Sequence, residues 1–486
     1  TCSSSAGNSG VIEKSYKEGG NHMSITYGEI IIEGIEFTKI LMLKISHKPN
    51  EHGYLTIAGE IDSQKAQEFT DRADETTQII VKAKGEEEQT LFNGGILNIA
   101  IKNEADYSIL TINGITSSYT QDIQKLSRSY QNTTKTYEQI LNEAYQGNGS
   151  VDVTVEDKPI GAFIMQMNET NWEFTKRMAS RFNVPIFTSI IAPKPMVYVG
   201  LPPVGNTKEI TTTSYGHGKD ENKYNTITQN YMADNASAMR QDFSGFFAHS
   251  LDYVYLGDQI SLNQKTYFVK SVEAILIDGL LEMTYELVGK TGFVAPIAKN
   301  DNCSGRILTG QVRAVKQDLV QVHLLEIDKD FDSSGNWWFP YSTAYSSSDG
   351  SGWYVMPEIG DYVRIMFPSG NEAAGFAASS ANKAPLSNPR HKSFRAPSGK
   401  EVLMTDEGLY IICNHQKIFI DLTPEHGIKI VSDKDINIVS TANIAVSANK
   451  DIQILAKKQV YIGTPESFIT ITPEQISLAA KDVIIT

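Results

Sequence analysis

The chain has 486 residues, of which 41% are hydrophobic and 21% charged, and its formal net charge at pH 7 is −14. This length is too great for one hydrophobic core, so we expect three or more domains. The acidic balance argues against nucleic acid as a partner, because phosphate binding needs a basic face. No run of 18 or more apolar residues is present, so we expect no integral membrane segment.

The N-terminal residues 1–23 lack an apolar core and predict a flexible tail rather than a secretory signal. The three cysteines, Cys2, Cys303 and Cys413, are far apart and odd in number, so a disulfide framework is not expected. Both features favour synthesis in the cytoplasm without a signal peptide.

Residues 24–110 are short alternating runs bounded by Gly, Asn and Asp, and they predict a first β-barrel. Residues 111–199 predict a small mixed α/β insertion that contains two helices. The first helix begins with a capping-box pattern, Thr136 with Gln139, and the second begins with Thr170 and Glu173.

Residues 200–297 return to strand patterns, including "YNTITQNY" at 224–231, and predict a second β-barrel similar in texture to the first. The short "GHG" at 216–218 is interpreted as a turn. Residues 298–382 contain about five strands, the size of an OB-fold barrel. Residues 383–417, which contain Pro and Ser, predict a neck.

From residue 418 to 486, pairs of apolar residues recur every eight residues. Residues at i and i+2 lie on one face of a strand, so each octad predicts one half-buried strand and one corner. Eight residues cannot close a coil of a single-chain solenoid, but three chains wound together can enclose a core. The predicted trimer core of this needle consists of Ile420, Ile428, Ile430, Ile436, Ile438, Ile444, Val446, Ile452, Ile454, Val460, Ile462, Ile476 and Leu478.

Each layer of such a needle would turn six apolar side chains inward, which at roughly 1.5–3 kcal/mol each gives about 9–18 kcal/mol before entropy. The alternative is a flat antiparallel sheet of eight-residue hairpins. It is disfavoured because no Asn-Gly or Asp-Gly turn occurs between 428 and 462. The register shifts near Pro465 and Pro473, where Ile469 and Ile471 become the apolar pair, and we expect the needle to change section there.

The predicted fold is therefore mainly β, with two β-barrels, a small α/β insertion, an OB-like barrel and a C-terminal intertwined trimeric β-helix. The order of these parts resembles the VgrG family, the spikes of type VI secretion and related contractile injection systems. VgrG proteins look like fused hub and needle proteins of contractile phage tails.

Local motifs support the resemblance. The stretch 165–187 is similar to the family's Gln-x-x-Glu-Thr-Asp-x-x-Phe-x-x-Arg segment, with Asn171 where Asp is usual; the matching residues are Gln166, Glu169, Thr170, Phe174 and Arg177. The stretch 356–367 is similar to the family's Pro-x-x-Gly-Asp-x-Val strand; the matching residues are Pro357, Gly360, Asp361 and Val363. Residues 394–411 resemble the family's neck, whereas the family's Gly-Arg-Val before the second barrel strand is absent.

The resemblance implies a homotrimer at the tip of a contractile tube, where two hub barrels per chain match a hexameric inner tube protein and baseplate proteins. It also implies a PAAR-type tip protein on the blunt end, in contact with Val483, Ile484, Ile485 and Thr486, and effector cargo as an option. We expect assembly into an injection particle that acts outside the cell or in target cells. Which system this is, secretion system, extracellular particle, tailocin or phage, stays open.

We expect the chain to have no enzymatic activity and to bind no cofactor or metal ion. The neck is too short to hold an inserted lysozyme, and the chain reaches Thr486 still in the octad register. The alternatives are a phage hub and needle with cell-wall-degrading activity, or a trimeric β-helical fibre or adhesin.

Several residues allow both a structural and a functional interpretation. Glu169 and Glu173 are interpreted as helix-start residues rather than catalytic acids. Asp328, Asp330 and Asp332 form an acidic loop, with weak calcium binding as the alternative. His47 and His52 lack the neighbours of a metal site. Trp337, Trp338 and Trp353 are interpreted as core or trimer contacts, with a carbohydrate platform as the alternative.

Overall fold

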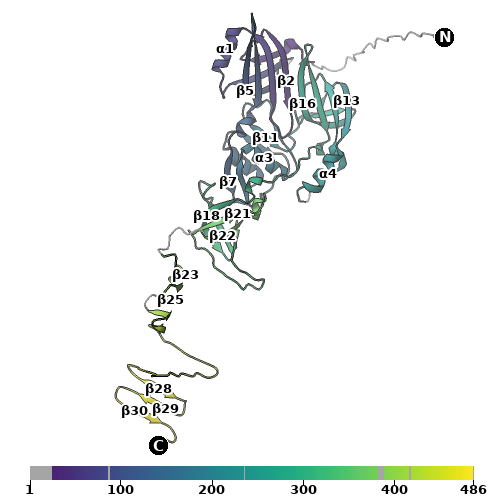
Figure 1. Cartoon of the computed structure of the whole chain (residues 1–486). Helices are drawn as coiled ribbons and strands as arrows, with labels where there is room; N and C mark the ends of the chain where they lie inside the picture. Colours follow the sequence, from purple (N-terminus) through teal and green to yellow (C-terminus); the bar gives the residue numbers. More distant parts are fainter. Residues whose placement is uncertain (1–23, 86–87, 235, 381–387, 415–416, 485–486) are drawn as a thin grey trace, which may run out of the picture. The chain divides into compact units, whose positions relative to one another are not determined.

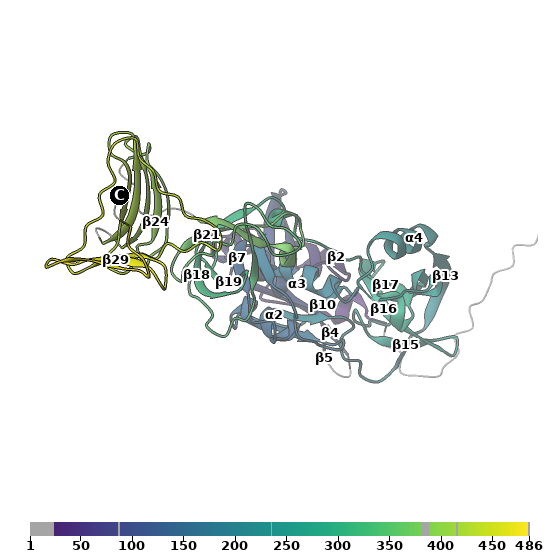
Figure 2. The same cartoon turned by 90° about the horizontal axis from the view of Figure 1, so that it is seen from below.

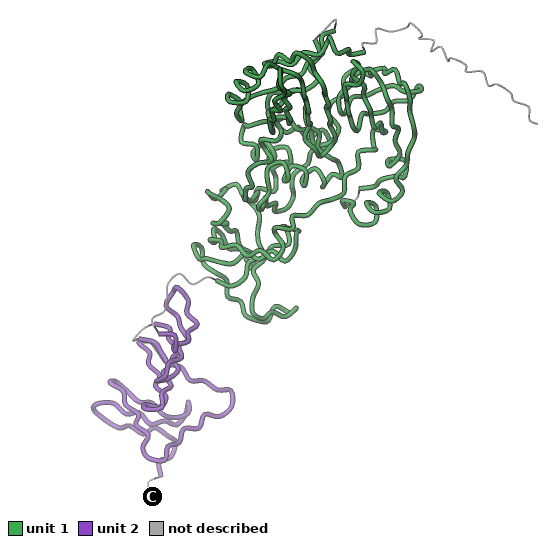
Figure 3. Tube along the Cα trace, turned by 45° about the horizontal axis from the view of Figure 1, so that its top comes forward, with its two compact units in different colours: residues 1–383 green, residues 384–486 purple. Residues whose placement is uncertain are grey.

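The computed structural model describes residues 24–85, 88–234, 236–380, 388–414 and 417–484. The chain forms two compact units, residues 1–383 (unit 1) and 384–486 (unit 2), which Figure 3 shows in different colours. The predicted tail, 1–23, lies outside the described residues. Within the described part of the chain, no helix is both long and apolar enough to cross a membrane.

A twelve-stranded sheet dominates unit 1 (Figure 1). Its main path runs β1-β4-β5-β6-β3-β2-β16-β17-β14-β13, while β15 pairs with β16 and β12 with β15. The bounds are β1 Ile30–Glu33, β2 Lys39–His47, β3 Tyr54–Ile61, β4 Gln78–Lys84, β5 Glu88–Asn103, β6 Ser108–Thr116, β12 Lys208–Glu209, β13 Thr212–Lys219, β14 Ser244–Ser250, β15 Gln259–Leu262, β16 Lys265–Ile277 and β17 Leu280–Val288.

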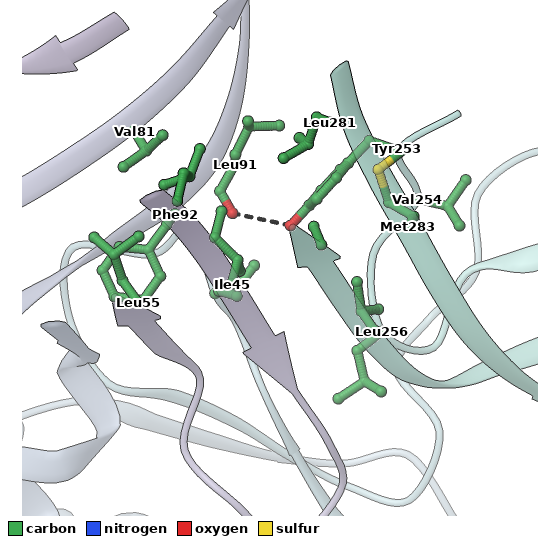
Figure 4. Close-up of a cluster of buried hydrophobic side chains, with 14 of the residues drawn as sticks. Ile45, Leu55, Val81, Leu91, Phe92, Tyr253, Val254, Leu256, Leu281 and Met283 are labelled. Carbon is green, nitrogen blue, oxygen red and sulfur yellow. Dashed lines mark hydrogen bonds between the residues drawn. The ribbon is translucent and has the colours of Figure 1, made fainter. Parts of the chain in front are cut away.

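The two β-rich regions that the sequence separates share this one sheet, because β2 pairs with β16 from His47↔Val272 to Lys44↔Ile275. They also share one hydrophobic core, part of which Figure 4 shows. There the hydroxyl of Tyr253 donates a hydrogen bond to the backbone oxygen of Leu91 at 3.1 Å and joins the two regions. The predicted boundary at residue 110 falls inside β6, so that strand belongs to the sheet rather than to the insertion.

The insertion packs two helices and short strands around its own core. Both predicted helices are present, and both capping boxes form, at Thr136 with Gln139 and at Thr170 with Glu173. The elements are β7 Leu126–Tyr130, α2 Tyr137–Tyr145, β8 Ser150–Val153, β9 Ile164–Glu169, α3 Asn171–Ser180, β10 Ile186–Thr188 and β11 Met196–Val199.

Two local predictions are wrong. The stretch 224–231 was expected to be a strand, but residues 224–230 lie in helix α4, Glu221–Asn230, which Asp220 caps by accepting from the backbone N–H of Lys223. The "GHG" stretch, read as a turn, lies within β13, where His217 is opposite Phe246. A further helix, α1 Ser63–Arg72, was not predicted; it starts at Asp62, whose carboxylate accepts two backbone N–H groups. The caps at Asp62 and Asp220 favour helices in two stretches where the sequence pattern favoured strands.

A closed five-stranded barrel follows, with the order β18-β19-β20-β22-β21. Its interior is apolar and includes Val312, Val322 and Ile365, together with Phe163 and Met165 from the insertion. The bounds are β18 Ile307–Lys316, β19 Leu319–Leu324, β20 Phe339–Ser342, β21 Tyr362–Met366 and β22 Phe376–Ser380. The short 3-10 helices of unit 1 are η1 Tyr27–Glu29, η2 Ser117–Gln121, η3 Arg240–Phe243, η4 Lys290–Gly292, η5 Asp301–Cys303 and η6 Glu372–Ala374.

Unit 2 contains two antiparallel sheets of consecutive strands, β23 to β27 and β28 to β30 (Figure 2). No strand is assigned to residues 432–459 between them. The bounds are β23 Lys392–Arg395, β24 Glu401–Met404, β25 Leu409–Asn414, β26 Ile418–Thr423, β27 Gly427–Val431, β28 Val460–Gly463, β29 Phe468–Ile471 and β30 Ile476–Ala479.

Candidate functional site

The five-stranded sheet of unit 2 has one continuous apolar face. Directly opposite residues of antiparallel strands point to the same side, and the pairs Leu422↔Ile428, Ile420↔Ile430 and Ile411↔Ile420 follow one another across the strands. The apolar residues of this face include Phe394, Val402, Met404, Leu409, Ile411, Ile420, Leu422, Ile428 and Ile430, and Lys392, opposite Met404, lies at its edge. The predicted neck therefore continues into the same sheet as the first predicted needle strands.

The three-stranded sheet repeats this arrangement. Its apolar side consists of Val460, Ile462, Ile469, Ile471, Ile476 and Leu478. Phe468, which keeps the octad spacing, lies on the opposite side and packs on Tyr461 with ring centroids 4.9 Å apart. The expected shift of the apolar pair to Ile469 and Ile471 is confirmed. The turns that cause it start at Thr464 and Thr472, each followed by Pro-Glu, and Pro suits the second position of a tight turn.

Residues 432–459 hold the remaining predicted core residues, and here the chain makes no strand of its own. The six predicted core residues in this segment are between 52% and 76% exposed; they are Ile436, Ile438, Ile444, Val446, Ile452 and Ile454. At the predicted tip contact, Val483 and Ile484 are exposed, whereas Ile485 and Thr486 lie outside the described residues.

In residues 388–414 and 417–484, no hydrophobic side chain is buried. A single copy thus presents two ordered apolar faces and an unpaired stretch with the same periodicity. The antiparallel pairing within β23–β27 and β28–β30 matches the local geometry of the alternative, a flat hairpin sheet. A flat sheet leaves these faces in water, however, and monomeric soluble proteins rarely expose large contiguous apolar patches.

The stretch 165–187, which carries the resemblance, forms a buried ionic junction between the insertion and the five-stranded barrel. Arg177 on α3 is 3% exposed and binds Glu169 through two nitrogen atoms, at 2.7 and 2.8 Å. Its third nitrogen binds Glu372 on η6 of the barrel at 2.8 Å, and Arg181 binds the same carboxylate oxygen at 2.7 Å. Arg177 also donates to the backbone oxygen of Met165 at 2.8 Å.

The charges of this junction support one another. Burial alone would lower the pKa of Arg177, but Glu372 and Glu169 raise it above its ordinary value. Burial alone would raise the pKa of Glu372, but Arg177 and Arg181 hold it below its ordinary value. Arg177 and Glu372 therefore stay ionised, and removal of Arg177 leaves buried carboxylates without their main counter-charge.

Other residues of the resemblance have structural partners too. Asn171, which replaces the usual Asp, accepts hydrogen bonds from Arg128 at 2.8 Å and from Gln166 at 3.2 Å. In the barrel motif, Gly360 has a φ of 96°, and Asp361 accepts the backbone N–H of Glu358 at 2.9 Å, so both hold the turn before β21.

A cluster resembling a catalytic triad lies beside the start of α3. His52 bonds the hydroxyl of Ser118 through Nδ1 at 2.8 Å and the carboxylate of Asp122 through Nε2 at 3.3 Å. Trp172 stacks on the imidazole at 4.1 Å, and Asp122 accepts from Thr170 at 2.5 Å. Ser118 is 1% exposed and also bonds Thr116, so this cluster fastens the helix start to the sheet and offers no open nucleophile.

The remaining candidate residues lie apart from one another. His47 is buried and bonds Thr188 at 2.8 Å, and burial, followed by the nearby His52, lowers its pKa to about 3. Asp328 accepts two hydrogen bonds from Ser129, and burial raises its pKa. In the described residues, no group of three His, Cys, Asp or Glu side chains could hold a metal ion.

The three tryptophans do not form one surface. Trp337 packs in the barrel core against Phe163 and Phe339, whereas Trp353 is exposed on the connection between β20 and β21. Of the cysteines, Cys303 is buried and burial raises its pKa to about 12, Cys413 is exposed, and Cys2 lies outside the described residues.

No family model and no curated protein matches the chain. Solved structures do match. The E. coli c3393 protein, a type VI secretion component with structural similarity to the T4 bacteriophage tail proteins gp27 and gp5, aligns at a TM-score of 0.52 and 12% identity over 73% of this chain and 99% of that chain.

The chain has the fold of these hub proteins. The Francisella PdpA-VgrG complex in its lidded form aligns at a TM-score of 0.52 and 10% identity over 82% of this chain and 79% of the other. The half-lidded form aligns at 0.50 and 10% over 84% and 87%. The resemblance to the VgrG family is thus confirmed at the level of fold, and so is the mainly β class with its closed small barrel.

The sequence did not predict the partners in these clusters. Glu372 is 195 residues from Arg177, and nothing near it marks it as an ionic partner. Ser118 and Asp122 belong to a short polar stretch without periodicity. One signal in the sequence was Arg177, which stands between the apolar Phe174 and Met178 of a predicted helix, because a charge buried there needs a paired acid.

Proposed function

We propose that this protein is the homotrimeric spike of a contractile injection apparatus. In this proposal its hub adapts a hexameric inner tube to a threefold needle, and the needle pierces the target envelope. The observation that carries the proposal is the contrast within one chain: a hub-like fold with a complete core, followed by a unit whose regular apolar faces are exposed in a single copy.

Three copies of unit 2 can bury the apolar residues that one copy leaves exposed. Each copy contributes one wall, and the octad residues of three walls face a common core. The segment 432–459, which makes no strand alone, then pairs with the other two chains. Because such a prism has no free lateral edge, it is stiff and slow to unfold.

Partners follow from the same proposal. The hub faces the tube protein and baseplate, and a PAAR-type tip protein covers the end near Val483 and Ile484, whose side chains are exposed. Effector cargo is an option, supported by the fold likeness to the VgrG of the PdpA-VgrG complex. The particle is assembled from cytoplasmic protein and acts outside the cell or in target cells.

We also propose that the chain is not an enzyme. The triad-like cluster of His52, Ser118 and Asp122 is the best candidate for a catalytic site, and the burial of Ser118 and His52 supports a structural role instead. Release of soluble muropeptides from peptidoglycan, lost on Ser118→Ala with the fold intact, would overturn this part of the proposal.

Mass and symmetry test the spike. Light scattering on the purified chain should give three times the chain mass, and averaged electron micrographs should show a threefold particle with a thin extension. A stable monomer contradicts the proposal. A trimer without a hub-sized head favours the fibre or adhesin instead.

A further inference from the structure

Residues 343–359, which make up most of the connection between β20 and β21, form an ordered arm on the five-stranded barrel (Figure 1). It is a hairpin: the backbone N–H of Trp353 bonds the oxygen of Tyr345 at 2.9 Å, and Ser346 pairs with Gly352. At the tip, Asp349 accepts the backbone N–H of Ser351 at 3.0 Å. Gly352 has a φ of 149°, and a Cβ there would lie 2.3 Å from the oxygen of Tyr345, so the hairpin requires glycine.

The arm holds apolar side chains in solvent. Five of them are between 43% and 73% exposed: Tyr345, Trp353, Tyr354, Val355 and Ile359. Asp349 is the only charged residue from 342 to 357, in a chain where 21% of residues are charged. The hydroxyl of Tyr354 bonds the backbone oxygen of Gln317 at 3.0 Å, which fixes the arm to the turn between β18 and β19. Rigid exposed Trp and Tyr side chains are the usual anchors of protein interfaces.

The topology of the barrel decides which partner the arm meets. β20 and β22 are parallel, with Tyr341 opposite Ala377 and Ser342 opposite Ala378, so both strands end at the same side of the barrel. The arm therefore starts beside the point where the chain leaves the barrel at Ser380. Eleven residues separate Ser380 from Lys392, the first residue of β23, and such a stretch spans at most about 40 Å.

In a trimer of unit 2, this tether limits the distance between the exit end of each barrel and the shared needle. An arm with seven residues from Ser342 to Asp349 reaches up to roughly 20 Å from its barrel. We propose that the arm of each copy packs on the barrel of the next copy and closes a second trimer contact outside the needle. This inference rests on the proposed trimer and names an interface that the octad does not contain.

Photo-crosslinking tests it. A benzoylphenylalanine at position 353 is placed in full-length protein assembled from a mixture of isotopically light and heavy chains. The expected result is mixed light and heavy cross-links from residue 353 to residues 305–380 of another copy. The same group at Tyr107, on the exposed turn between β5 and β6, sets the background.

Subunit exchange gives a second readout that does not need the cross-linker. The double variant Trp353→Ser, Tyr354→Ser should exchange subunits at least tenfold faster than the wild type, while Tyr107→Ser should not change the rate. A trimeric protein with only intrachain cross-links and unchanged exchange overturns the arm interface but leaves the spike standing. A monomer overturns both. Arm variants that instead lose binding to isolated peptidoglycan, with cross-links at background, would show that the arm serves a glycan surface and would also overturn the proposal.

Discussion

Units 1 and 2 use apolar residues in opposite ways. Unit 1 buries them in three clusters, and side chains such as Leu43, Ile57 and Phe174 have no exposed area. Unit 2 arranges them with equal regularity but leaves them in water. The difference shows that regular periodicity does not imply a self-sufficient core: unit 1 buries its apolar residues within one chain, whereas the described apolar residues of unit 2 stay exposed or partly exposed.

The largest effect is expected in the needle. Ile438→Asp would place three carboxylates in one layer of the proposed core, and burial of an unpaired carboxylate costs several kcal/mol. We expect a monomer by light scattering. The matched control is Asn437→Asp, which adds the same charge on the opposite side of the strand that the proposed trimer would form, and it should remain trimeric. Equal behaviour of the two variants would contradict the octad assignment.

All four tryptophans of the chain, residues 172, 337, 338 and 353, lie in unit 1. Tryptophan fluorescence therefore follows unfolding of unit 1 alone, while mass follows association through unit 2. Ile438→Asp should leave the fluorescence transition close to that of the wild type.

The second effect concerns the ionic junction in unit 1. Arg177→Ala leaves Glu169 buried without its ion-pair partner and leaves Glu372 with Arg181 alone, and it should destabilise unit 1 by about 3–5 kcal/mol, measured by urea unfolding followed by fluorescence. Lys65→Ala removes an exposed pair with Glu36 and should cost less than about 1 kcal/mol. A similar shift for both would mean that the junction is not a stabilising element.

The third effect depends on pH. Since burial lowers the pKa of His47 to about 3, the unfolded chain binds one more proton between that value and its ordinary pKa near 6.5. The contribution of neutral His47 to the free energy of unfolding is fully present above pH 6.5 and decreases as the pH falls toward 3. Between pH 7 and pH 5 this amounts to about 2 kcal/mol.

The matched variant for this pH effect is His47→Gln, which keeps a polar group near Thr188 and does not titrate. We expect the wild type to lose about 2 kcal/mol more than the variant between pH 7 and pH 5, measured by the fluorescence transition in urea. Parallel losses in the two proteins would show that His47 is accessible to protons in the folded state.

The smallest effect is expected at the helix caps. Thr170→Ala removes the cap of α3 together with the hydrogen bond to Asp122, and Thr136→Ala removes the cap of α2 alone. Loss of a cap costs about 1 kcal/mol, and we expect Thr170→Ala to cost more because it also frees a partly buried carboxylate. The reverse order would argue against the role of Asp122 in fastening α3.

Much of the fold could be predicted because local patterns and the final structure agree there. The caps at Thr136 and Thr170 defined two helices, and the shift to Ile469 and Ile471 was visible in the apolar spacing. The stretch 224–231 shows the limit, since β-branched alternation favoured a strand while the cap at Asp220 produced a helix.

Long-range pairing was not predictable for a physical reason. The link between β2 and β16 joins residues more than 200 positions apart, and backbone hydrogen bonds carry no side-chain signature in the sequence. The same holds for Glu372, which looks like any surface acid until the barrel brings it to Arg177. The arm is only partly predictable: the sequence marks Trp353 as a candidate contact residue, but the exposure of its side chain depends on the hairpin geometry.

Hydrogen exchange of residues 432–459 tests the central claim most directly. A single chain makes no strand there, so its amides would exchange at the rate of an unfolded peptide. If the three chains pair as proposed, these amides should be as protected as those of β5 and β6 in the core of unit 1. Exchange at the unprotected rate in the purified protein would contradict the account.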